Sequence, residues 1–116
     1  MKLVLAVAAL VAALAVPAAS AVGSTLNGTV GPGFTITLDK SGKKVSTLTP
    51  GSYTIKVADK ANIHDFHLFG PGVNKVITTV PFVGTKSVTV TLKKGTYTYQ
   101  CDPHAAAGMK ATFKVS

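Results

Sequence analysis

The chain has 116 residues and a formal net charge of +8, which comes from twelve lysines, no arginine, four aspartates and no glutamate. The lysines are scattered and mostly lie beside turns, without the arginines or stacking aromatics of a nucleic-acid interface, so a nucleic-acid partner is not expected. A single cysteine excludes an internal disulfide, and a bound metal is the other common way to stabilise a small exported domain.

Residues 1–21 have the features of a signal peptide that directs export. Lys2 precedes an apolar run over residues 3–16, which is followed by Pro17 and the small residues 19–21. The run is shorter than the roughly 20 residues that span a membrane. We therefore expect cleavage of this segment, no stable membrane insertion afterwards, and a periplasmic or extracellular protein with one domain over residues 22–116. The alternative is a retained N-terminal helix.

Beyond residue 22, short runs rich in Thr, Val, Ile, Tyr and Phe alternate with turns rich in Gly, Pro, Asn and Asp. No segment there carries a helical apolar stripe. Strands are expected over residues 25–30, 34–38, 52–57, 63–68, 86–92, 96–101 and 110–115, with weaker candidates near Val45 and Val76. Seven to nine short antiparallel strands predict an all-β fold, a two-sheet Greek-key β-sandwich.

The strand over residues 96–101 ends at the only cysteine of the chain. Tyr97, Tyr99 and Cys101 share one face of this strand, because side chains alternate between its two faces. If the tyrosines face the core, Cys101 lies at the edge of the core and is shielded from solvent.

Cys101 is followed by His104 and Met109 in the stretch CDPHAAAGM. A thiolate, an imidazole and a thioether are soft or borderline ligands, and together they suit a copper ion that cycles between Cu(I) and Cu(II). An electron-transfer copper site has two histidines, so one more is needed. The stretch NIHDFHLFG offers two candidates, His64 and His67.

On these residues the chain resembles the cupredoxins, the small blue copper proteins, and is most similar to their plastocyanin and pseudoazurin branch. CDPHAAAGM matches the ligand loop C-x-P-H-x4-M of that branch, and HDFHL resembles its first-histidine motif. The resemblance implies one copper per chain. It implies that the ligands are His64, Cys101, His104 and, in the axial position, Met109.

The choice of His64 over His67 follows the family motif and the alternation of the strand. Phe66 and Leu68 share a face with His64, whereas His67 points to the opposite face. His67 is accordingly expected to be a solvent-facing strand residue.

Two residues beside the ligands depart from the family pattern. Asp65 stands where the family usually has an asparagine that ties the strand to the ligand loop, and Asp102 stands where serine or threonine is common. Either one carboxyl group binds a proton at a raised pKa, or both are solvated and separated by water. Gln100 replaces the exposed tyrosine that plastocyanins have before the cysteine, which makes electron entry by that side route doubtful.

The leading hypothesis is a monomeric one-electron carrier that passes electrons through the exposed edge of His104. Its partners are expected to be redox proteins, including ones with acidic surfaces, that dock transiently. The small residues 105–107 surround this edge, and the loops containing Phe34 and Pro71 are expected to extend the apolar surface.

Two other functions fit the same sequence. The first is copper carriage or storage by the same ligands, which predicts a solvent-open site. The second is a metal-free structural sandwich in which Cys101 is a buried thiol without a function. An enzyme is not expected, because four filled ligand positions leave no place for a substrate.

Overall fold

The computed structural model describes residues 23–116, which form ten strands and a 3₁₀ helix. The strands are β1 (Ser24–Val30), β2 (Ile36–Lys40), β3 (Lys43–Lys44), β4 (Thr47–Leu48), β5 (Gly51–Asp59), β6 (Phe66–Gly70), β7 (Val73–Thr78), β8 (Gly84–Leu92), β9 (Gly95–Gln100) and β10 (Lys110–Val115). The 3₁₀ helix, η2 (Asp102–Ala107), connects β9 to β10. The predicted signal peptide, residues 1–21, lies outside the described residues.

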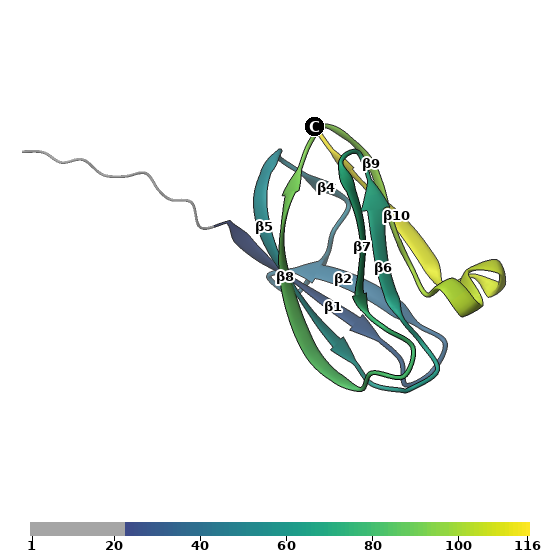
Figure 1. The fold of residues 1–116 in the computed structure, drawn as a ribbon. Helices are drawn as coiled ribbons and strands as arrows, with labels where there is room; N and C mark the ends of the chain where they lie inside the picture. Colours follow the sequence, from purple (N-terminus) through teal and green to yellow (C-terminus); the bar gives the residue numbers. More distant parts are fainter. Residues whose placement is uncertain (1–22) are drawn as a thin grey trace, which may run out of the picture.

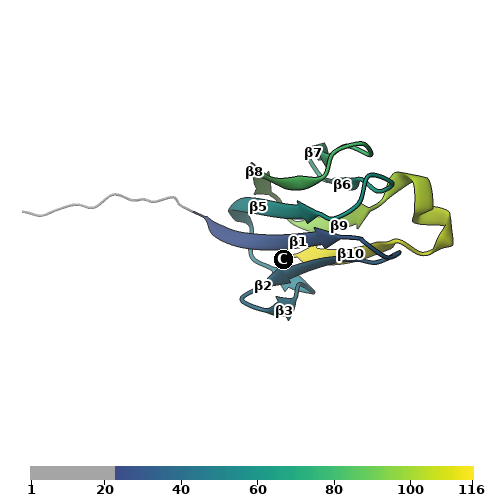
Figure 2. The same cartoon turned by 90° about the horizontal axis from the view of Figure 1, so that it is seen from below.

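The strands form two five-stranded sheets that pack face to face (Figure 1, Figure 2). The first sheet has the order β3-β2-β1-β5-β8 and the second the order β4-β10-β9-β6-β7. The chain leaves the first sheet at β4 and returns to it at β5, then crosses to the second sheet for β6 and β7, returns at β8 and leaves again at β9. The predicted all-β Greek-key sandwich is therefore confirmed, with eight strands of five residues or more and the two-residue strands β3 and β4.

The expectation that all strands are antiparallel was wrong for two pairs. β1 runs parallel to β5, with Ser24 opposite Tyr53, and β4 runs parallel to β10, with Leu48 opposite Val115. Alternation of apolar residues identifies the buried face of a strand, but it carries no information about the direction of the neighbouring strand.

The core between the sheets is made of residues at alternate strand positions. Tyr53, Ile55 and Val57 of β5 are buried, and the residues between them are more exposed. Tyr97 and Tyr99 of β9 are also completely buried, as the sequence predicted. Each such side chain stabilises the fold by about 1.5–3 kcal/mol relative to an exposed position.

The two ends of the sandwich are built differently. At one end β9 leads into η2, drawn as a yellow-green coil in Figure 1. At the other end the Tyr97 hydroxyl donates to the Pro71 carbonyl at 2.7 Å and accepts from the Lys93 N–H at 2.9 Å, so the β6–β7 and β8–β9 turns are joined. Pro71 thus lies at the far end of β9 from Cys101, and the expectation that its loop extends the apolar surface around His104 was wrong.

Among residues 23–116 there is no helix with the length and apolar character of a membrane span.

Candidate metal centre

The connection between β9 and β10 carries Cys101, His104 and Met109. Pro103 lies in the first turn of η2, where its missing N–H costs nothing, and Gly108 ends the helix with a left-handed φ of 104°. Two backbone hydrogen bonds close the loop: the His104 N–H donates to the Cys101 carbonyl, and the Cys101 N–H donates to the Met109 carbonyl, both at 3.0 Å. These backbone hydrogen bonds therefore help to set the spacing of the three residues.

His64 enters from the connection between β5 and β6 and is completely buried. Gly31, between β1 and β2, packs against it, because a Cβ there would lie 2.9 Å from the His64 Cδ2 and its φ of 75° favours glycine. Phe66 and Leu68 are buried on the same side of β6. The structure thus turns His64 inward, in the direction that strand alternation predicted.

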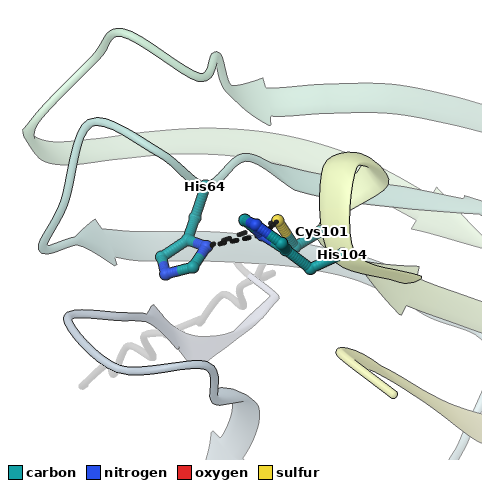
Figure 3. A group of neighbouring side chains, drawn as sticks. All are labelled: His64, Cys101 and His104. Carbon is teal, nitrogen blue, oxygen red and sulfur yellow. Dashed lines mark hydrogen bonds between the residues drawn. The ribbon is translucent and has the colours of Figure 1, made fainter. Parts of the chain in front are cut away.

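Three side-chain atoms from these two segments point toward one another (Figure 3). The His64 Nδ1 lies 3.1 Å from the His104 Nδ1, and the Cys101 Sγ lies 3.5 Å and 3.4 Å from these two nitrogens. The centre of this triangle lies about 1.9 Å from each atom, close to the roughly 2.0 Å of a metal–imidazole bond and shorter than the roughly 2.3 Å of a metal–thiolate bond. One thiol and two imidazoles also form a donor set that suits copper, so ligand type and convergence both fit the metal.

Met109 follows at the end of the same loop. Its side chain is buried in the core cluster that includes Cys101, and its N–H donates to the His104 carbonyl at 3.2 Å. Its backbone is therefore held by the two ligand candidates that precede it in the loop. The thioether that this loop carries is a soft donor of the kind that suits copper.

Phe34 packs over the cluster while remaining 65% exposed to solvent. Its ring meets both imidazoles edge-on, with centroid distances of 5.5 Å to His64 and 4.8 Å to His104. His104 is partly exposed beside it, whereas Cys101 and His64 are completely buried. The sequence placed Phe34 at the start of a strand; β2 begins two residues later, which leaves Phe34 in the loop.

Burial raises the pKa of the Cys101 thiol, because the apolar surroundings disfavour the thiolate. A metal ion that binds here must displace the thiol proton. The positive charge of the metal then stabilises the buried thiolate.

Asp65 and Asp102 are joined directly, which rules out the expected alternative of two solvated carboxylates separated by water. The Asp65 Oδ1 accepts the Asp102 backbone N–H at 2.6 Å, and Asp65 is buried. Desolvation raises the pKa of Asp65. Asp65 thereby makes the strand-to-loop tie that the family assigns to asparagine. Asp102 is exposed. Its partial burial alone would raise its pKa, but the hydrogen bonds from Gln100 and His67 outweigh this effect and lower the pKa.

His67 is not part of the metal cluster. It lies on the outer face of β6, as expected, but it is not simply solvated. Its Nδ1 lies 2.9 Å from the Asp102 Oδ1 and 3.1 Å from the Oδ2, and its Nε2 lies 2.6 Å from the Asn74 Oδ1. Burial disfavours the protonated ring and alone would lower its pKa. The hydrogen bonds to Asn74 and Asp102 outweigh this effect and raise the pKa of His67. Asn74 could not be identified from the sequence, because its contact with His67 depends on the pairing of β6 with β7.

A family model described as copper binding proteins, plastocyanin/azurin family, matches residues 54–116, a range that contains all four predicted ligands. Among solved structures, reduced rusticyanin is 26% identical, with a TM-score of 0.56 over 83% of this chain and 82% of that chain. A structure of substituted rusticyanins is also 26% identical, with a TM-score of 0.55 over 83% of this chain and 80% of that chain. A search of curated protein sequences found no match.

Proposed function

The chain belongs to the plastocyanin/azurin family of copper-binding proteins, and from this premise we propose that it is an exported one-electron carrier. It is a cupredoxin with copper as its cofactor. The observation that carries the proposal is the convergence of two imidazole nitrogens and one sulfur, held by two segments of the sandwich. Ligands that are already in place rearrange little when the metal changes charge, and rapid electron exchange requires this.

We propose that His64 and His104 would hold the copper through their Nδ1 atoms, Cys101 through its sulfur and Met109 through its thioether. Bound copper supplies one-electron chemistry by alternating between Cu(I) and Cu(II). The protein contributes a dry pocket, since Cys101 and His64 have no exposed surface. It also contributes a fixed loop, since backbone hydrogen bonds hold the spacing from Cys101 to Met109.

The exposed edge of His104 is the proposed electron route to a partner. His104 is partly exposed. An exposed apolar surface lies near His64 and His104, in the sequence or in space, and consists of Phe34, Ile63 and the alanines 106–107. A small apolar surface suits brief encounters between monomeric redox proteins, because little polar surface has to be desolvated. No catalytic step is proposed.

The alternative, copper carriage or storage, requires a metal that leaves readily through a solvent-open site. The complete burial of Cys101 and His64 supports the electron carrier instead.

The test is to add Cu(II) to the purified domain, residues 22–116, and to record its visible and electron paramagnetic resonance spectra. We expect a blue thiolate-to-copper charge-transfer band that disappears on reduction and returns on oxidation. Cys101→Ala removes the band, and a band that survives this substitution, or a wild-type protein that stays colourless, contradicts the proposal. Ready transfer of copper to a weak chelator, without reversible reduction, would favour carriage.

Export and domain limits are part of the same proposal. We propose that residues 1–21 are a signal peptide and that the mature domain is residues 22–116. Mass spectrometry of the protein recovered from the periplasm or the medium checks this, because a cleaved chain begins at Val22. An intact mass with Lys2 still present would contradict it.

A further inference from the structure

The exposed outer face of β6 carries a hydrogen-bond network that the copper ligands do not use. His67 lies at its centre and contacts Asp102 through Nδ1 and Asn74 through Nε2. The Gln100 Nε2 donates to the same Asp102 carboxylate at 2.9 Å, and the Phe69 ring packs at 4.9 Å from the His67 ring. The network joins β7, β6, β9 and the first residue of η2.

Asp102 is the residue at which this network reaches the metal centre. Its carboxylate is held from the outer side by His67 and Gln100, and its backbone N–H is held from the inner side by Asp65. Cys101 is bonded directly to this doubly anchored residue. Helix η2 has no buried residues of its own, and its first residue, Asp102, is exposed, so hydrogen bonds are the contacts that hold Asp102 in place.

We propose that His67 is a positioning residue for the copper centre: by holding the Asp102 carboxylate against β6, it fixes the start of η2 and with it the Cys101 sulfur. The proposal rests on the assignment of Cys101 as a ligand. The His67 contact itself is near the surface, where the Asp102 side chain is 41% exposed. Ion pairs at such positions add little to global stability, so the contribution of His67 is to the geometry of one loop. Partners that orient a metal ligand typically change metal affinity by about 10–100-fold when removed.

The contacts of the two ring nitrogens of His67 can be tested one at a time by substitution. The amide nitrogen of asparagine takes roughly the place of Nδ1 and that of glutamine the place of Nε2. His67→Asn therefore keeps a donor for Asp102 and loses the contact with Asn74, and His67→Gln does the reverse. Asp102→Ala removes the other side of the same contact, and Thr96→Ala, on the exposed face of β9 away from the loop, is the matched control.

The first readout uses the metal-free protein: the rate at which Cys101 reacts with a thiol reagent, together with hydrogen exchange at the Asp102 amide. Wild-type Cys101 is completely buried, so it reacts only when the loop opens. We expect His67→Gln and Asp102→Ala each to speed the reaction by about 10-fold, the effect of losing one hydrogen bond to a charged group. The double variant should match the single ones, because both remove one contact. His67→Asn and Thr96→Ala should stay within about twofold of wild type.

The second readout uses the copper-loaded protein. His67→Gln and Asp102→Ala should shift or weaken the thiolate-to-copper band and speed copper transfer to a chelator, whereas His67→Asn restores both. Rates for His67→Gln and Asp102→Ala equal to that of Thr96→Ala, or effects that add in the double variant, overturn the positioning role. A wild-type protein without a blue band contradicts the proposed function instead. The measurements on the metal-free protein then decide by themselves whether His67 positions the loop.

Discussion

Two histidines three residues apart, His64 just before β6 and His67 on its outer face, have opposite surroundings. On the inner side His64 is completely buried, faces the Cys101 sulfur and has an Nε2 without a hydrogen-bond partner among the described residues. On the outer side His67 is partly exposed, and both of its ring nitrogens have hydrogen-bond partners. The difference shows that position relative to the core, more than residue type, decides whether a histidine faces the Cys101 sulfur or joins a surface hydrogen-bond network.

The same contrast extends to the aromatic residues of the strand. Phe66 on the inner face stacks on Tyr99 at 5.6 Å and is completely buried, whereas Phe69 on the outer face packs on His67. The inner face therefore carries the core and the proposed ligands. The outer face carries a polar network that acts on the ligand loop from outside.

The largest expected difference between the two faces is in copper binding. His64→Ala removes a proposed ligand, so the blue band and tight copper binding should be lost, whereas His67→Ala should keep a blue band of altered intensity. Titration of both variants with Cu(II), followed by visible spectra, measures this. Loss of the band in His67→Ala with retention in His64→Ala would reverse the ligand assignment.

The next difference is in folding stability. Phe66→Ala leaves a cavity in the core and should lower the free energy of unfolding by about 3–5 kcal/mol. Phe69→Ala on the outer face should cost less than about 1 kcal/mol. Urea denaturation of the two metal-free variants compares them, and similar losses in both would show that the two faces are not energetically distinct.

A smaller effect is expected where the two faces meet, at Asp65. Asp65→Ala leaves the Asp102 N–H without its acceptor and should cost about 1–3 kcal/mol. Asp65→Asn keeps an acceptor and removes a carboxyl group whose burial raises its pKa, so it should be at least as stable as wild type at neutral pH. Thermal unfolding of the pair checks this, and equal losses in both variants would mean that the hydrogen bond contributes nothing.

The smallest expected effect is a pH dependence of folding stability that arises from His67 on the outer face of β6. The pKa of His67 is raised in the folded state above its usual value of 6.5. Its contribution to stability is therefore fully present below about pH 6.5 and is lost as the pH rises through the folded-state pKa. Urea midpoints of metal-free wild type and His67→Asn, compared between about pH 5 and pH 9, isolate it because His64 and His104 remain in both. Parallel pH profiles would contradict the contribution of His67.

What the sequence predicted well was local. The spacing of Cys101, His104 and Met109 lies within one loop. The alternation predicted correctly that His64 points inward, although the strand expected over residues 63–68 begins only at Phe66. The predicted strands and the sandwich follow from the same short-range patterns. Helix η2 was not expected, because its alanines form no amphipathic stripe and backbone hydrogen bonds at Cys101 and Gly108 define its ends.

What the sequence could not predict depends on register and on contacts between distant segments. The parallel pairing of β1 with β5 joins strands about thirty residues apart. The contact of Phe34 with both imidazoles needs the β1–β2 loop to meet the ligand loop. The contact of His67 with Asn74 appears only once β6 is paired with β7 across an irregular register.

The β9–β10 hairpin has a consequence for the order of assembly. It brings Cys101, His104 and Met109 together by closing one short loop, whereas His64 joins the cluster from 37 residues before Cys101. Short loops close faster and at lower entropic cost than long ones, and hairpins form in about 1–10 μs. During folding, we expect a chain whose first sheet is still incomplete to gather three of its four proposed metal donors. Copper that arrives before folding is complete would then meet a partial site, and the docking of His64 would be the step that closes it.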